Sequence, residues 1–107
     1  MAYAIVVTQL AKAELDELRV FDRRRIVTEI RTHLAGTPDV PTRTRKRLVH
    51  DPMTGVSTDF EYVPPLWELR VGDFRVLYDV DAEQHEVNIR AVRRKGPEQT
   101  TQEVVRG

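Results

Sequence analysis

Residues 65–81 read Pro-Leu-Trp-Glu-Leu-Arg-Val-Gly-Asp-Phe-Arg-Val-Leu-Tyr-Asp-Val-Asp, and this stretch predicts two antiparallel strands joined by a tight turn. Apolar and polar residues alternate on either side of the Gly-Asp pair, and a period of two is typical of strands with one buried face. A two-residue turn that begins with glycine places Val71 opposite Phe74. The hairpin is therefore expected to give one apolar face to a protein core, where Trp67, Phe74 and Tyr78 pack.

The opposite face of this hairpin carries arginines. In the predicted register Arg70 lies directly across from Arg75, and like charges in a cross-strand pair are unfavourable by about 0.2–1 kcal/mol. A bound polyanion or an acidic partner chain would offset this repulsion, because a guanidinium group matches phosphate and carboxylate oxygens at two points. The alternative is a plainly solvated strand face, on which Glu68 lies diagonally close enough to neutralise one arginine.

The composition describes one globular domain. At 107 residues the chain has the size of a single domain, which we expect to span residues 1–107. It contains 17 basic and 17 acidic residues, so its net charge of zero gives no argument for nucleic-acid binding. We expect a soluble cytoplasmic protein without membrane contact, because no apolar run is long enough to span a membrane and no signal peptide opens the chain. Since the chain has no cysteine and its three histidines are scattered, we expect neither a metal site nor a cofactor.

Two basic clusters flank the hairpin in the sequence, one at residues 43–47 and one at residues 90–95. If they converge in space they form a surface for nucleic acid, and otherwise they are solvated side chains. The candidate RNA-binding residues in these clusters are Arg43, Arg45, Lys46, Arg47, Arg90, Arg94 and Lys95.

The rest of the chain predicts a sheet with a helical hairpin on one face. Apolar spacing and capping residues predict helices over 9–18 and 22–35, with Thr8 and Asp22 as N-caps. The remaining expected elements are a first strand over 2–7, a short strand within 43–49, a long loop over 50–65, a last strand over 87–93 and a helical turn opened by Thr100 or Thr101. The fold class is therefore α+β, with the order β-α-α-β-β-β and a mostly antiparallel sheet. Its second face is expected to be open and lined by arginine.

The register of the last strand decides which arginines share that open face. If Val80 pairs with Val87, then Val76 meets Ala91, and Arg90 joins Arg70 and Arg75 on the far face. A slip of one residue would reverse this arrangement, because side chains alternate between the two faces. In the long loop, Phe60 and Tyr62 are candidates for contact with a partner.

These residues resemble the RelE/ParE superfamily of toxins from type II toxin–antitoxin modules. The resemblance covers nearly the whole chain and rests on the order of elements, the opening stretch from Tyr3 to Leu18, Arg-Lys-Arg-Leu at 45–48, the hairpin, and the closing Val-Asn-Ile-Arg-Ala-Val-Arg-Arg-Lys at 87–95. It implies a small toxin that a cognate antitoxin neutralises by draping a helix and an extended segment over it.

The resemblance implies one of two targets. RelE-like toxins cut mRNA in the ribosomal A site without a metal, using the 2′-hydroxyl of the RNA as nucleophile. ParE-like toxins inhibit DNA gyrase by binding it. Our prediction is a ribosome-dependent mRNA endonuclease, with mRNA and the ribosome as partners beside the antitoxin. The alternatives are a gyrase inhibitor and a degenerate toxin fold that binds only its antitoxin.

Carried over residue by residue, the resemblance gives a partial catalytic set. Arg75 falls at the strand arginine that contacts the scissile phosphate, and Arg93, Arg94 or Lys95 falls at the second basic position. The candidate catalytic residues are Arg70, Arg75, Glu68 and Arg93. Two features depart from the RelE-like pattern: Leu66 and Glu68 stand where lysines are usual, and residues 96–99 lack the usual tyrosine or histidine. Glu68 is either a general base or simply the partner of an arginine.

Overall fold

The computed structural model describes residues 2–48, 58–96 and 100–106, so the first half of the predicted loop at 50–65 lies outside the described residues. The elements are β1 (Ala4–Val7), α1 (Gln9–Asp16), α2 (Val20–Leu34), β2 (Arg45–Arg47), β3 (Trp67–Val71), β4 (Phe74–Asp81), β5 (Glu86–Arg94) and α3 (Thr101–Arg106). The predicted α+β architecture is confirmed, and β2 and α3 are the short strand and the helical turn expected at those places. Four strands follow the helical hairpin, one more than the predicted order β-α-α-β-β-β contains.

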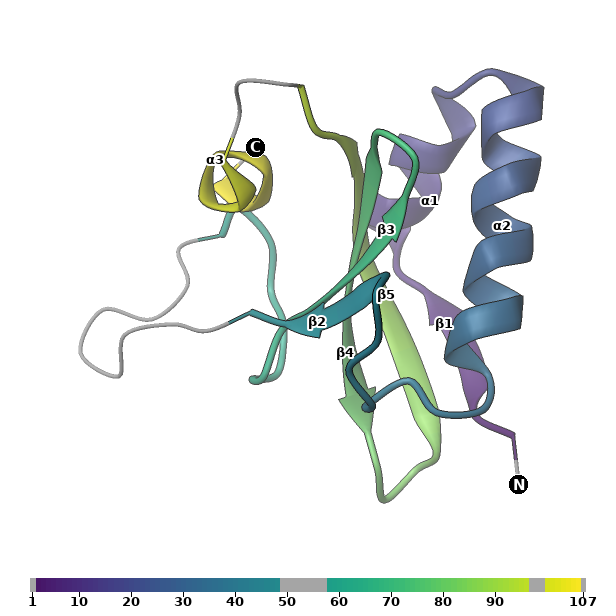
Figure 1. Ribbon diagram of the computed structural model, residues 1–107, viewed down its shortest axis with the longest axis vertical. Coiled ribbons are helices and arrows are strands. Elements are labelled where there is room, and N and C mark those ends of the chain that lie inside the picture. The colour runs from purple at the N-terminus through teal and green to yellow at the C-terminus, as the bar shows by residue number, and fades with distance from the viewer. Residues whose placement is uncertain (1, 49–57, 97–99, 107) are drawn as a thin grey trace.

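The described strands form one mostly antiparallel sheet in the order β1-β5-β4-β3-β2 (Figure 1). Only β1 runs parallel to its neighbour, β5. The predicted hairpin register is confirmed, with Val71 opposite Phe74 and Arg70 opposite Arg75. Gly72 has a φ of 57°, in the left-handed region that a side chain disfavours, so a glycine suits this turn.

A β-bulge changes the predicted pairing of the last strand. Tyr78 pairs with Ile89 as expected, but Leu77 pairs with Ala91, so the intervening Arg90 is an extra residue in β5. The predicted pairing of Val76 with Ala91 is therefore wrong. Beyond the bulge every residue of β5 is shifted by one, and the residue opposite Arg75 is Arg93.

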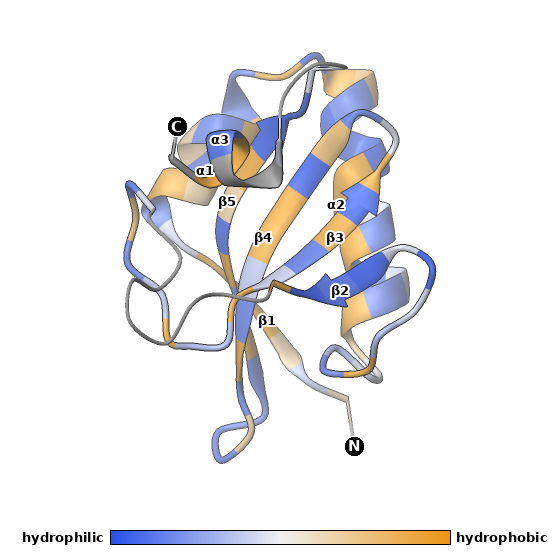
Figure 2. Ribbon diagram, turned by 60° about the vertical axis from the view of Figure 1, so that its left-hand side comes forward, coloured by the Kyte–Doolittle hydropathy of each residue, from blue (hydrophilic) through white to orange (hydrophobic). Residues whose placement is uncertain are grey.

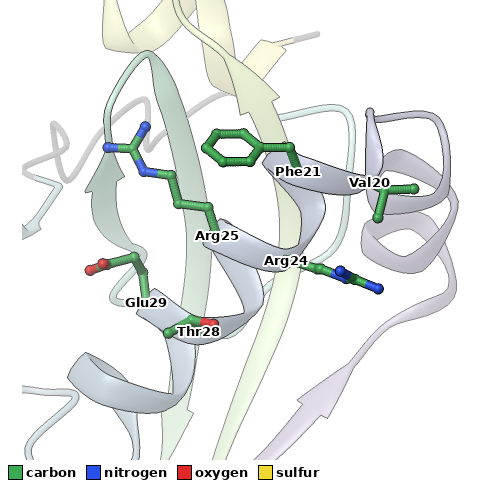
Figure 3. A pocket seen from close by; sticks show the side chains of 6 residues that line it. All are labelled: Val20, Phe21, Arg24, Arg25, Thr28 and Glu29. Carbon is green, nitrogen blue, oxygen red and sulfur yellow. The ribbon is translucent and has the colours of Figure 1, made fainter.

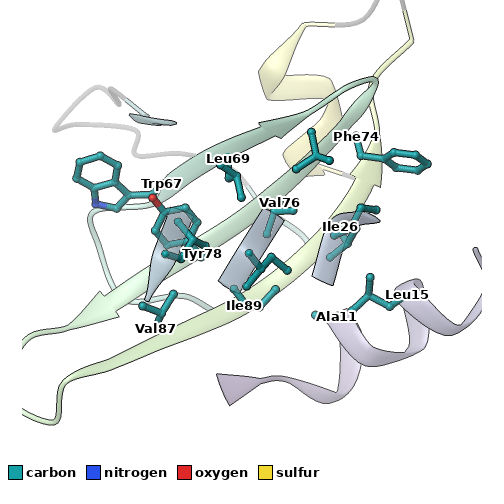
Figure 4. Packing of buried hydrophobic residues seen from close by; sticks show 14 residues of the cluster. Ala11, Leu15, Ile26, Trp67, Leu69, Phe74, Val76, Tyr78, Val87 and Ile89 are labelled. Carbon is teal, nitrogen blue, oxygen red and sulfur yellow. The ribbon is translucent and has the colours of Figure 1, made fainter. Parts of the chain in front are cut away.

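Helices α1 and α2 cover one face of the sheet and form the main core (Figure 4). The predicted cap of α1 is confirmed, because the Thr8 side chain accepts a hydrogen bond from the Ala11 amide. Helix α2 begins at Val20, so Asp22 lies in its first turn instead of capping it. The expected packing of the hairpin aromatics is confirmed, and Trp67 stacks on Tyr78 with a centroid distance of 6.2 Å.

The expectation of an open second face is wrong. A smaller apolar cluster lies there, formed by Leu48, Leu66, Leu77, Ala91 and Val105, with Phe60 and Tyr62 packed against it. Helix α3 contributes Val105 and lies on the side of the sheet opposite to α1 and α2 (Figure 1). The reason is that Leu77 and Ala91 sit at the centre of this face, where apolar area is stabilised by being covered.

Tyr78 ties the main core to the segment after α2. Its hydroxyl donates a 2.6 Å hydrogen bond to the Pro38 carbonyl, and the side chain is fully buried. Burial raises the pKa of the Tyr78 phenol far above its ordinary value, while the positive charge of Arg45 acts in the opposite direction.

This burial predicts an alkaline loss of stability. In the unfolded chain Tyr78 ionises near pH 10, whereas the folded chain keeps the proton to higher pH. The native state then binds more protons, so the free energy of unfolding falls as pH rises above about 10, by at most about 1.4 kcal/mol per pH unit. Urea unfolding at pH 8–11 checks this. Tyr78→Phe should remove the part of this pH-dependent decrease that Tyr78 causes, and the control Tyr3→Phe should retain it. An equal dependence of the unfolding free energy on pH in both variants would contradict the assignment to Tyr78.

Candidate functional site

Three arginines stand side by side across the sheet near the tip of the β3–β4 hairpin. Arg70 of β3 pairs with Arg75 of β4, which pairs in turn with Arg93 of β5. We call these three residues the arginine row. The β-bulge makes Arg93 its third member, in place of the predicted Arg90.

Within the arginine row, Arg70 and Arg75 differ in exposure. Arg70 is exposed and has no ion pair within the part of the chain that the structure describes. The side chain of Arg75 is only 12% exposed. Its Nη1 donates to the carbonyls of Gly72 and Phe74, both at 2.9 Å, and its Nε lies 3.8 Å from Glu68. Arg75 thus braces the hairpin turn and presents little of its guanidinium to solvent.

Arg93 is fully engaged by protein groups. Its Nε donates to Glu14 of α1 at 2.9 Å, and its terminal nitrogens donate to both carboxylate oxygens of Asp59. Nη1 also donates to the Val104 and Val105 carbonyls at the end of α3. Burial alone would lower the pKa of the Arg93 guanidinium, but hydrogen bonds to Asp59 and Glu14 outweigh it and raise the pKa. Arg93 therefore joins α1, α3 and the segment before β3.

Arg90 is also neutralised inside the protein. Its Nε donates to Asp79 at 2.7 Å, and the Asp79 carboxylate, 1% exposed, further accepts hydrogen bonds from the Val63 amide and the Asn88 side chain. The geometry explains why Arg90 is separated from the arginine row. The bulge turns it toward the acidic β4–β5 end of the sheet.

Glu68 lies under the arginine row and is 3% exposed. Its Oε1 is 3.8 Å from Arg75 and 3.9 Å from Lys46 of β2, distances that give charge attraction without a hydrogen bond. Its Oε2 has no hydrogen-bond partner among the described residues. A buried carboxylate oxygen without a hydrogen bond destabilises the folded chain. The neighbouring positive charges of Arg75 and Lys46 partly offset this cost, and the carboxylate is not presented to solvent.

The basic cluster at 43–47 does not act as one surface. The β2 strand is hydrophilic throughout (Figure 2), but Arg45 turns inward and is 7% exposed. It donates to the carbonyl of His33 in the last turn of α2 and to the carbonyl of Thr37 after the helix. Its guanidinium closes the end of α2 and is not available to RNA. Arg43, Lys46 and Arg47 remain exposed.

Arg94, the next residue after the arginine row, packs on an aromatic ring of the main core. Arg94 is exposed and stacks on Phe74, with 4.8 Å from its guanidinium carbon to the ring centroid. The Lys95 amide donates to the Asp73 carbonyl. The structure therefore brings together Arg70, Arg75 and Arg93 with Glu68 and Lys46, whereas Arg45, Arg90 and Arg94 make their contacts elsewhere.

Three carboxylates were missed by reasoning from the sequence: Glu14, Asp59 and Asp79. Each neutralises an arginine that had been assigned to the site. Glu14 precedes Arg93 by 79 residues and Asp59 precedes it by 34, so no local pattern connects them. In the sequence, each of the three is simply a polar residue on an expected helix, loop or strand face.

Within the described residues, no group of His, Asp and Glu side chains is arranged to hold a metal ion. In the same part of the chain, no helix combines the length and the apolar character that crossing a membrane requires.

Comparison with known proteins gives a family and a fold. The family described as ParE toxin of type II toxin–antitoxin system, parDE, matches residues 5–96. The fold is similar to a chain of the RelBE2 toxin–antitoxin complex from Mycobacterium tuberculosis (TM-score 0.64, 23% identity, covering 89% of this chain and 100% of that chain). It is equally similar to a chain of the archaeal RelE–RelB complex from Pyrococcus horikoshii (TM-score 0.65, 22% identity, 91% and 99% covered). No curated protein sequence matches.

Proposed function

The chain belongs to the family of ParE toxins of type II toxin–antitoxin systems, and from this premise we propose that it arrests growth by binding DNA gyrase, and not by cutting RNA. A cognate antitoxin neutralises it by covering its surface. This proposal replaces the preference for an mRNA endonuclease that the sequence suggested.

The observation that carries the proposal is the internal neutralisation of Arg93. Metal-free RNA cleavage needs a group that removes a proton, a group that returns one, and free cations that steady the developing phosphate charge. In this structure the Arg93 guanidinium donates hydrogen bonds to Glu14, Asp59 and two carbonyls, and its side chain is 12% exposed. Inhibition by binding needs no general base, so the same arrangement is no obstacle to it.

A second candidate function, ribosome-dependent mRNA cleavage, is favoured by Glu68. A buried carboxylate with one oxygen lacking a hydrogen bond, flanked by two cations, is the kind of group found at catalytic sites. In that mechanism Glu68 is the general base, and Arg70 and Arg75 hold the scissile phosphate. The exposed Arg43, Lys46, Arg47 and Arg94, together with the partly buried Lys95, contact RNA.

Expression of the wild-type chain in a growing culture separates the two candidates. Gyrase inhibition predicts double-strand DNA breaks and intact transcripts, whereas mRNA cleavage predicts transcripts cut at codon boundaries. Arg70→Ala/Arg75→Ala should leave growth arrest unchanged if the toxin acts on gyrase, and should abolish it if the toxin cuts RNA. Glu68→Gln, which keeps the size of the side chain, separates the same two outcomes. An expressed, folded chain without any effect on growth would contradict both and indicate a fold that binds only its antitoxin.

A further inference from the structure

The first turn of α2 exposes apolar side chains that the core does not use. Phe21 is 77% exposed and Val20 is 50% exposed. They line a shallow hollow of about 540 Å³ together with Arg24, Arg25, Thr28 and Glu29 (Figure 3). We call these six residues the α2 patch. Single exposed apolar residues are ordinary, but a phenylalanine and a valine side by side, rimmed by polar groups, are typical of an interaction site.

The charge around Phe21 is mostly positive and unpaired. The structure gives Arg24 and Arg25 no ion pair with any described residue, and Glu29 is paired with His33 at 2.8 Å. Arg24 and Arg25 are neighbours just after the first turn of the helix, whose acidic residue is Asp22. Arg19 occupies the N-cap position and makes no capping hydrogen bond with its side chain. An acidic partner would relieve both the charge repulsion and the missing cap.

The Arg25 side chain lies against the hairpin turn. Its Nη1 lies 2.9 Å from the position that a Cβ on Gly72 would occupy, so the glycine lets the guanidinium lie against the turn. Figure 3 shows Arg25 extending from α2 toward the β3–β4 hairpin, on one side of Phe21. A guanidinium that is already positioned loses less side-chain freedom when it binds a carboxylate.

We propose that the α2 patch is the surface by which this toxin contacts its protein target, and that the target offers acidic side chains around an apolar residue. The inference rests on the proposed function and adds the binding surface to it. Aromatic and arginine side chains are the residues that most often carry the affinity of a protein interface. A protein partner fits the patch better than a nucleic acid, because Val20 and Phe21 place exposed apolar area at its centre, which an apolar side chain of a protein can cover.

The test compares patch variants with matched controls from exposed positions elsewhere. Phe21→Ala and Arg24→Glu change the patch, whereas Val40→Ala truncates an exposed apolar side chain and Arg31→Glu reverses an exposed charge outside it. Each purified variant is titrated against DNA gyrase in a plasmid supercoiling assay, and each is expressed to measure growth arrest. Both patch variants should require about tenfold more protein for half inhibition, and both controls should match the wild type. Thermal unfolding confirms that every variant is folded.

The possible outcomes separate this inference from the proposed function. A wild-type chain that does not inhibit gyrase ends the gyrase proposal, while growth arrest lost only in the patch variants still supports the α2 patch as a contact with another target. Patch variants that are as toxic as the wild type overturn the inference. The same holds if they stay toxic but escape neutralisation by the cognate antitoxin, because the patch would then bind the antitoxin. A further outcome also overturns the inference. If the patch variants inhibit supercoiling less than the wild type but bind gyrase equally tightly in the absence of DNA, the patch contacts nucleic acid.

Discussion

Replacement of Asp79 by alanine is expected to lower the free energy of unfolding by about 3–5 kcal/mol, the typical cost of leaving a buried charge without its partner. The Asp79 carboxylate is 1% exposed and accepts hydrogen bonds from Arg90, the Val63 amide and Asn88. All three donors lose their acceptor in the variant. Urea unfolding, followed by circular dichroism, measures the change.

A matched control for this prediction is Asp16→Ala, which removes an exposed ion pair with Lys12. That pair should be worth no more than about 1 kcal/mol, because water screens both charges. The double change Asp79→Ala/Arg90→Met removes the orphaned guanidinium as well, so its destabilisation should be smaller than that of Asp79→Ala alone. A double variant that loses the sum of the two single effects would show that the pair is not coupled.

The second large effect is expected at Arg93. Arg93→Ala removes the donor that joins Glu14, Asp59 and the carbonyls of α3, and we expect a loss of about 2–4 kcal/mol in the free energy of unfolding. The neighbouring Arg94→Ala is the control. Arg94 is exposed and its main contact is the Phe74 ring, so its removal should cost less than about 1 kcal/mol.

The Arg93 prediction also concerns where the stability is lost. Helix α3 is attached to the sheet by Val105 in the smaller apolar cluster and by the hydrogen bonds from Arg93. Amide hydrogen exchange of α3 should therefore speed up more in Arg93→Ala than exchange in β4. Equal protection of α3 in the wild type and the variant would mean that apolar contacts alone hold this helix.

The hairpin shows what local sequence can determine. Alternating side chains and a two-residue turn with Gly72 were enough to predict the pairing of Arg70 with Arg75, and the structure agrees residue by residue. The prediction succeeds because the turn length sets the register and the pleat sets the faces. The cap at Thr8 was predictable for the same reason, since it depends on only four consecutive residues.

The last strand shows where local sequence stops being sufficient. One extra residue at Arg90 shifts the strand, and no glycine or proline in the sequence marks that bulge. As a result Arg93, and not Arg90, completes the arginine row. Arg45 is a similar case, because its inward position depends on two carbonyls at the end of α2 that only the folded chain brings near it.

The sequence by itself determined the α+β order of elements, the hairpin and its register, and the resemblance to a toxin family. Only the tertiary structure decided which arginines keep their charge available to a partner. Arg93 is neutralised by carboxylates 34 and 79 residues away in the sequence, and Arg90 by a carboxylate 11 residues away. Arg24 and Arg25, in contrast, have no ion pair among the described residues. The physical reason is that the strength of a charge pair depends on distance and burial, and both are set when remote segments pack together.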